Sequence, residues 1–390
     1  MSLPFLDITA PGFSTKSAEV MEARARSWCA ETPLGFAVLR HRQAGQLLRD
    51  RRLRQGSHAW PGVVGLQGRF AEFWSASLIS LEGPEHKRLR QAAQSALAQD
   101  FILSLAPAFH RTAAELLDSL PPEFDMVDHF TEPFAGRAIT TLLGLPDSDA
   151  PALAHDASRL GLAMGLDAKT HEATANAACD RLSGLAGDLI DRAETERDAY
   201  FVGRLLTAAH ALDITDRQTL IDLIVIAIFG GVDTTRAQLA FAAWLFANHP
   251  AEWNWLRDNP GGIPHAIEEV IRCYPTTTWA TREALEDIAL DGVTLPKGAT
   301  VHIFVHASGT DPAIGGEVGF DIRARRKNHF GFGGGAHHCL GQFVARTDMA
   351  AAIAEWLPRW KRIDVVGSPG FLPDSGNTSP SCLVLRPELA

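Results

Sequence analysis

One cysteine, Cys339, follows a run of glycines and precedes a segment with helical periodicity, Leu340 to Leu357. Four glycines stand just before it: Gly331, Gly333, Gly334 and Gly335. Their backbone freedom allows an unusual loop that places the sulfur at the N-terminus of a helix. Free N–H groups and the helix dipole favour a thiolate there, and a thiolate restrained by hydrogen bonds is a good iron ligand. We therefore expect Cys339 to bind a metal.

The same segment is open to three other interpretations. A lone buried cysteine is usually a small hydrophobic residue with no chemical role. His337 and His338 beside Cys339 could suggest zinc, although adjacent side chains diverge and zinc sites usually space their ligands. A glycine-rich loop before a helix could also bind phosphate, but the lysine of a Walker loop is absent.

The segment resembles the cysteine loop of the cytochrome P450 family. That signature is Phe, two residues, Gly, one residue, Arg or His, one residue, Cys, one residue and Gly. It is matched here by Phe332, Gly335, His337, Cys339 and Gly341. The resemblance implies haem b with Cys339 as the axial ligand, Phe332 packed near the sulfur, His337 facing a haem propionate and Gly341 completing the cofactor-binding loop.

A second pair, Glu269 and Arg272, is three residues apart and therefore shares one helix face. Taken alone, such a pair is usually a solvated surface salt bridge. In the family, a Glu-x-x-Arg pair at this distance before the cysteine forms a buried ion pair. Many bacterial relatives add a third basic partner where this chain has Gly319, and the sequence leaves open whether Arg323 or Arg325 replaces it.

A third group lies in an apolar helical segment, where Gly230 and Gly231 precede Asp233 and Thr234. Two glycines inside a helix cost about 1 kcal/mol each relative to alanine, so they could mark a break at which Asp233 or Thr234 caps a new helix. The family places an acid–threonine pair after a small residue here. The resemblance therefore implies that both residues are catalytic, Thr234 bonding bound oxygen and Asp233 relaying protons.

Three basic side chains resemble the family's haem-propionate ligands. His86 and Arg90 are four residues apart on one helical face, and Arg282 lies ten residues beyond Arg272 on an expected strand. Guanidinium groups suit this task because they can bind a carboxylate through two hydrogen bonds.

The substrate pocket is inferred from the position of apolar and aromatic residues in the family. We expect it to be lined from Trp60–Leu78, Ile226–Thr234, Thr277–Ala280 and the turn Ser375–Thr378. Each could equally be a core residue. The pocket candidates are Trp60, Phe73, Ile226, Gly230, Trp279 and Ala280.

Hydrophobic periodicity predicts the elements that must position these residues. Helices are expected at Arg42–Leu53, Glu85–Leu97, Phe101–Leu120, Phe130–Leu143, Asn176–Glu196, Asp216–Asn248 and Ile263–Tyr274. Strands are expected at Gly35–Leu39 and Thr300–Val305, with a hairpin turning at Asp291-Gly292. Long helices between small sheets near both ends predict one mainly α (α+β) domain over residues 1–390, resembling the cytochrome P450 fold.

Composition narrows the class of protein. A net charge of −10 argues against nucleic-acid binding, and five scattered cysteines suggest a reduced, cytoplasmic protein. No segment suggests a signal peptide or a membrane span, and nothing requires more than a monomer.

Together with the resemblance, these features predict a haem-thiolate monooxygenase that activates O2 and inserts one oxygen atom into a small hydrophobic substrate. Electrons must come from a separate donor, either ferredoxin with its reductase or a flavodoxin. A peroxide-driven oxygenase is disfavoured because Asp233 and Thr234 are retained. A haem gas sensor is disfavoured because there is no room for an output domain.

Overall fold

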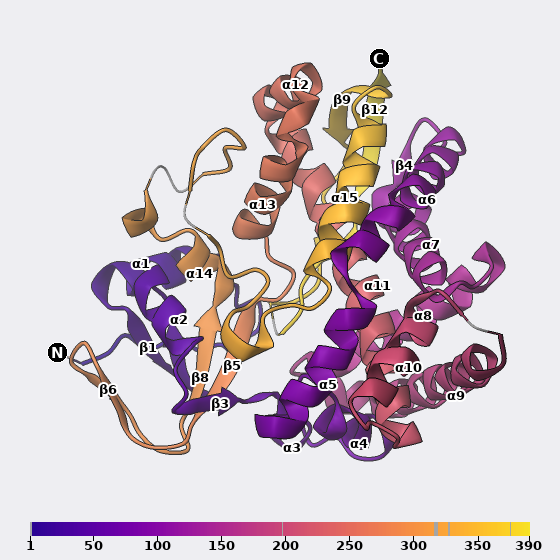
Figure 1. The fold of residues 1–390 in the computed structure, drawn as a ribbon. Helices are drawn as coiled ribbons and strands as arrows, with labels where there is room; N and C mark the ends of the chain where they lie inside the picture. The colour runs from indigo at the N-terminus through magenta and orange to yellow at the C-terminus, as the bar shows by residue number, and fades with distance from the viewer. Residues whose placement is uncertain (1, 197, 316–318, 327, 375) are drawn as a thin grey trace.

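The computed structural model describes residues 2–196, 198–315, 319–326, 328–374 and 376–390. Helices fill one side of the molecule, and a mixed sheet with α1, α2 and α14 forms the other (Figure 1). The longer helices are α5 (Gly83–Ala96), α6 (Gln99–Asp118), α7 (Glu132–Leu143), α8 (Ala150–Gly161), α9 (Glu172–Glu196), α10 (Phe201–Ala211), α11 (Arg217–Asn248), α12 (Pro250–Asp258), α13 (Ile263–Cys273) and α15 (Gln342–Trp356). The shorter ones are α1 (Ala18–Arg26), α2 (His41–Leu47), α3 (Trp60–Val64), α4 (Arg69–Ala76) and α14 (Val305–Gly309).

The main sheet joins the two ends of the chain. Its strand order is β1 (Cys29–Thr32), β2 (Gly35–Val38), β8 (Thr300–Phe304), β5 (Trp279–Ala284) and β3 (Leu53–Gln55). Only β2 and β8 pair in parallel, and this pairing brings residues near the N-terminus beside a late strand. The segment carrying Arg282 is therefore held between β3 and β8.

Three smaller sheets complete the strand content of the described chain. β4 (Phe124–Asp125), β12 (Val384–Leu389) and β9 (Trp360–Val365) form one, and β10 (Gly370–Phe371) with β11 (Pro380–Cys382) forms another. The predicted hairpin is confirmed as β6 (Ile288–Leu290) and β7 (Val293–Leu295). Asp291 and Gly292 have φ angles of 46° and 81°, as a tight hairpin turn requires.

α11 is the long central helix of the molecule and is buried on most of its surface. Asp216 caps its N-terminus, with the Thr219 N–H donating to the Asp216 carboxylate at 2.8 Å. The helix runs without interruption through Gly230 and Gly231 to Asn248. The alternative in which Asp233 or Thr234 caps a new helix is therefore wrong.

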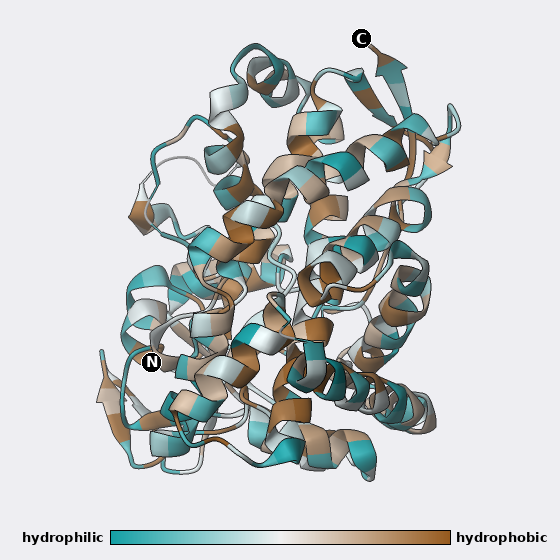
Figure 2. Ribbon diagram, turned by 45° about the vertical axis from the view of Figure 1, so that its right-hand side comes forward, coloured by the Kyte–Doolittle hydropathy of each residue, from teal (hydrophilic) through white to brown (hydrophobic). Residues whose placement is uncertain are grey.

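The predicted mainly α (α+β) fold class is confirmed. Figure 2 shows apolar residues gathered on the inward faces of the helices, as amphipathic packing requires. One expected helix, Arg42–Leu53, is too long: α2 ends at Leu47, and Leu53 already belongs to β3. Among the described residues, no helix is both long enough and apolar enough to span a bilayer.

Candidate functional site

The loop before α15 holds Cys339 in a fixed place. The Cys339 N–H donates to the Phe332 carbonyl at 2.9 Å, closing the loop on itself. Gly335 has a φ of 70°, and a β-carbon there would lie 2.1 Å from the Leu48 carbonyl oxygen, so only glycine fits against this backbone. A β-carbon at Gly341 would lie 3.9 Å from the Cys339 sulfur. The backbone of the loop therefore lies close to the Cys339 sulfur at Gly341 and close to the Leu48 carbonyl at Gly335.

The protein alone does not favour the Cys339 thiolate, which differs from the expectation. Burial raises the pKa of the thiol, while the Gly341 N–H and the charges of Arg90 and Arg346 act in the opposite direction. The sulfur also lies three positions before Gln342, the first residue of α15, so it receives less from the helix dipole than a capping residue would. A cation bound to the sulfur would favour its deprotonated form.

The Phe332 ring is held by a cation. The Arg346 guanidinium of α15 lies 4.4 Å from the ring centroid. Its Nε also donates to Glu268 of α13 at 2.6 Å. Burial raises the pKa of Glu268, but hydrogen bonds from His329 and Arg346 outweigh it and bring the pKa to about 2. The cysteine loop is thus fastened between α13 and α15.

Four predicted propionate ligands come together from three segments. His86 on α5 stacks against His337 with ring centroids 4.2 Å apart. Arg282 on β5 is buried and donates to Gln55 at 2.6 Å, and burial lowers the pKa of this guanidinium to about 10. Arg90, one turn after His86, donates to the His338 carbonyl beside Cys339. These basic groups surround one small region next to the cysteine loop.

This basic region contains one acid and one unsatisfied nitrogen. Glu82 lies at the start of α5, with its Oε1 3.0 Å from Nε2 of His337. Nε2 of His86 is buried and has no hydrogen-bond partner among the described residues. Two further carboxylates, such as the propionates of a haem, would supply the missing acceptors and balance the buried Arg282.

One face of α11 remains open although its surroundings are buried. Ile226, Gly230 and Thr234 recur every fourth residue and keep solvent exposure within an otherwise buried stretch. A β-carbon added at Gly230 would meet no atom within 4 Å. The Thr234 hydroxyl donates to the Gly230 carbonyl at 2.5 Å. The helix therefore faces an internal space, and a haem next to Cys339 fits the available donor set.

Comparisons with known proteins agree with this site. A model of the family described as "Cytochrome P450" matches residues 263–314. The chain is 35% identical over 393 residues to the luteothin monooxygenase of Streptomyces thioluteus, covering 98% of this chain and 96% of the relative. The chain belongs to the cytochrome P450 family. The mycinamicin IV hydroxylase/epoxidase of Micromonospora griseorubida is 31% identical, with 91% of this chain and 90% of the relative covered.

The solved structures support the cytochrome P450 fold. A cytochrome P450 from Chondromyces apiculatus superposes with a TM-score of 0.89 at 20% identity, covering 100% of this chain and 99% of that one. The fold and the curated relatives together make the chain a cytochrome P450 monooxygenase, a haem-dependent oxidoreductase that incorporates oxygen into its substrate.

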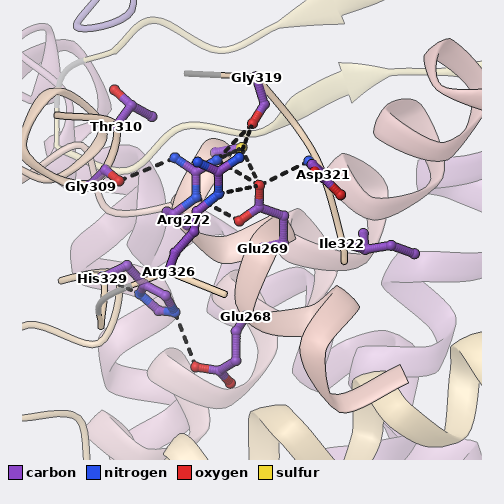
Figure 3. Close-up of polar contacts among 12 residues, drawn as sticks. Glu268, Glu269, Arg272, Gly309, Thr310, Gly319, Asp321, Ile322, Arg326 and His329 are labelled. Carbon is purple, nitrogen blue, oxygen red and sulfur yellow. Dashed lines mark hydrogen bonds and ion pairs between the residues drawn. The ribbon is translucent and has the colours of Figure 1, made fainter. Parts of the chain in front are cut away.

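The Glu269–Arg272 pair is buried, as the family resemblance implied (Figure 3). Arg272 donates to both carboxylate oxygens of Glu269 at 2.6 Å. It also donates to the carbonyls of Gly309 at 3.2 Å and Gly319 at 2.9 Å. The Nε of Arg326 lies 3.4 Å from Glu269, and both side chains are under 10% exposed. The pair therefore fastens α13 to the segment that leads into the cysteine loop.

The third basic partner is Arg326. The suggestion that Arg323 or Arg325 takes this place is wrong for both. Arg323 is half exposed and pairs with Glu252 of α12 at 2.6 Å. Arg325 is exposed. A basic side chain after Gly319 thus does replace the usual partner, but it comes one residue after Arg325 and three residues after Arg323.

The candidate pocket residues are not all in one place. Ile226 and Gly230 lie on the open face of α11, and the indole N–H of Trp60 donates to the Ala163 carbonyl at 2.8 Å. Phe73 is fully buried against Phe70 in the helical core. Trp279 stacks on Phe304 at 5.8 Å, inside the core cluster of the main sheet.

Ala280, the next residue of β5, is partly buried. In the turn Ser375–Thr378, Ser375 lies outside the described residues. Gly376 approaches the Met164 carbonyl, so this turn lies against the segment that follows α8.

Three residues of the site were not singled out from the sequence: Glu82, Arg326 and Arg346. Glu82 precedes His86 by four residues, a spacing that could have indicated its place beside the basic cluster. Arg346 follows Cys339 by seven residues and lies in the second turn of α15, so a basic residue there could have indicated a cation near the cysteine loop. Arg326 carries no local signal that separates it from its neighbours.

Proposed function

We propose that this cytochrome P450 binds haem b with Cys339 as the axial iron ligand. The carrying observation is that the loop holding the partly buried Cys339 adjoins a cluster of basic groups and leads into α15, which packs against α11 near its uncovered face. When bound, the haem supplies the oxygen chemistry, and electron donation from a thiolate favours O–O cleavage.

The chain's own residues hold that group. His86, Arg90, Arg282 and His337 bind its two carboxylates, and Phe332 covers the sulfur side of the loop. The backbone N–H of Gly341 donates toward the sulfur and restrains its negative charge. Arg346 keeps Phe332 in position through the contact with its ring.

Thr234 and Asp233 serve the proton steps. The Thr234 hydroxyl donates to the Gly230 carbonyl, and by rotating toward the open face of α11 it would be able to donate a hydrogen bond to a reacting group there. Asp233 is the buried acid next to it and passes protons inward from the surface. Neither residue is part of the haem-binding cluster, so each can be changed while haem content is preserved.

The substrate is a small hydrophobic organic compound. Support comes from the relatives, which are named for luteothin and mycinamicin IV, and from Ile226 and Gly230 on the uncovered face of α11. Luteothin is the first compound to test, because the relative named for it is 35% identical over nearly the whole chain.

An acidic ferredoxin with its reductase, or a flavodoxin, donates electrons at the face around His338. Arg49, Arg90 and Arg346 all place positive charge near this histidine. Phe343 lies three residues before Arg346 on α15, is 36% exposed, and offers an apolar centre for this docking face. We further propose a single domain over residues 1–390 that acts as a cytoplasmic monomer without nucleic-acid partners.

The test is isotopic. Purified protein, ferredoxin, ferredoxin reductase, NADPH and luteothin are incubated under 18O2, and the products are examined by mass spectrometry. The account predicts one 18O atom per oxidised product and no product without the electron donors. Product formed equally well from hydrogen peroxide alone would favour the peroxide-driven alternative.

A further inference from the structure

Both carboxylate oxygens of Asp233 are already engaged. Arg236, on the same helix, donates to Oδ1 at 2.9 Å, and both of these side chains are at most 10% exposed. The side-chain amide of Asn377 donates to Oδ2 at 3.1 Å. Gly161, the last residue of α8, lies over the carboxylate, since a β-carbon there would be 3.4 Å from Oδ1. The orientation of this acid is therefore set by its neighbours.

The two partners of Asp233 differ in what they fix. Arg236 is three residues along α11 and moves with Asp233 as one unit. Asn377 is more than a hundred positions away in the sequence and belongs to the turn before β11. Only Asn377 holds the carboxylate against a separate part of the protein.

The amide of Asn377 is itself oriented. The Thr277 hydroxyl donates to Oδ1 of Asn377 at 3.2 Å, which leaves the NH2 group pointing at Asp233. The turn is tied to the neighbouring segment by the Thr378 N–H to the Thr276 carbonyl and the Thr278 N–H to the Gly376 carbonyl, both at 2.8 Å. An amide fixed in this way is a donor of defined direction.

The base of the turn is anchored as well. Asp374 is buried and accepts from Lys16 at 2.9 Å and from the Thr15 N–H at 2.9 Å. Burial opposes ionisation, but the Lys16 ammonium lowers the pKa of Asp374 below its ordinary value. The N-terminal segment therefore holds the turn in place from the other side.

We propose that Asn377 is a positioning residue for proton delivery, acting through Asp233. Its amide holds the carboxylate in one rotamer beside Thr234, so that a proton is passed on rather than lost while the acid reorients. The inference rests on the proposed proton role of Asp233 and extends it to a residue that acts through this acid.

The experiment measures hydrogen peroxide released per NADPH oxidised, with plant-type ferredoxin and its reductase, in the presence and absence of luteothin. Impaired proton delivery would release reduced oxygen as peroxide instead of product, so the ratio responds to delivery, and the measurement without luteothin separates this effect from changes in substrate binding. The variants are Asn377→Ala, Asp233→Asn and the double variant. Thr277→Val is the variant that keeps Asn377 but removes the hydroxyl that orients its amide.

Ser381→Ala is the matched control. Ser381 is exposed on β11, directly after the same turn, and the change leaves Asn377 and Asp233 in place. Haem content and melting temperature are recorded for every variant, so that loss of folding is recognised directly.

The expected result is a peroxide ratio at least about threefold higher in Asn377→Ala, a modest part of what a general acid contributes. Thr277→Val should move the ratio in the same direction, and Ser381→Ala should match the wild type. In the Asp233→Asn background, Asn377→Ala should add no further change, because the two residues act as one unit.

Two outcomes overturn the inference, and they are distinguishable. If Asp233→Asn raises the ratio but Asn377→Ala does not, or if the two effects multiply, then Asn377 does not act through Asp233. If Asp233→Asn itself leaves the ratio unchanged, the proposed proton role fails, and the inference fails with it.

Discussion

Replacing Arg326 by methionine should destabilise the protein by a predictable amount. The change removes the guanidinium that lies 3.4 Å from the Glu269 carboxylate and keeps most of the apolar length of the side chain. Glu269 would still accept two bonds from Arg272 and one from the Asp321 N–H at 3.0 Å. The perturbation is therefore a partial loss of charge compensation and not the exposure of a bare buried acid.

The magnitude follows from the geometry. At an effective dielectric constant of about 20, opposite charges 3.4 Å apart attract by roughly 5 kcal/mol. Much of this is offset by the desolvation of a buried guanidinium, and hydrogen bonds to charged groups contribute a net of about 1.5–3 kcal/mol. With an unfolding entropy near 2.1 cal/mol/K per residue, 390 residues convert this loss to roughly 2–4 °C in melting temperature.

The assay is thermal unfolding of the haem-loaded protein, followed by circular dichroism at one fixed scan rate. Arg325→Met is the matched control, because this neighbour is exposed and its loss should change the melting temperature by less than about 1 °C. Equal melting temperatures for Arg326→Met and the wild type would refute the reasoning. So would a larger loss for Arg325→Met than for Arg326→Met.

Two further predictions concern other acids. Glu82→Gln removes a negative charge beside His86 and His337. Because Glu82 and the haem propionates carry like charges at a partly exposed position, its removal should slow haem transfer to apomyoglobin by about two- to fivefold. Faster transfer would contradict the placement of the propionates. Asp348 is buried on α15 and accepts from the Thr235 hydroxyl at 3.0 Å. Burial outweighs this bond and the one from the Met349 N–H, and raises the pKa of Asp348 well above its ordinary value of 3.8. The folded state keeps this proton while the unfolded state loses it above pH 3.8, so Asp348 costs stability that increases as the pH rises. Asp348→Asn should therefore raise the melting temperature at pH 7, and this gain should shrink as the pH falls toward 4; a gain independent of pH would refute the linkage.

The sequence was sufficient where the chemistry is local. The cysteine loop, the pair Glu269–Arg272 and the spacing of His86 and Arg90 each lie within a few residues, so residue type and period predict their shared face. The long helices were also predictable, because their apolar positions repeat over several turns. The curated relatives confirm the class of enzyme that these residues indicated.

The features that could not be predicted from the sequence depend on contacts between distant segments. Arg326 and Arg325 are adjacent arginines, and only the packing of the chain on α13 decides which one is buried beside Glu269. Asn377 reaches Asp233 across 144 positions, a relation that no local period contains. The thiolate preference of Cys339 was misjudged because burial of the sulfur, which raises its pKa, depends on tertiary packing.

The most direct test of the account is the ferrous–CO difference spectrum of the wild type beside Cys339→Ser. The account predicts a strongly red-shifted Soret band in the wild type that disappears in the variant, because only a thiolate ligand to the haem iron produces it. A wild-type band at the position of imidazole-ligated haem, or a red-shifted band that survives in Cys339→Ser, would contradict the assignment of Cys339 as the axial ligand.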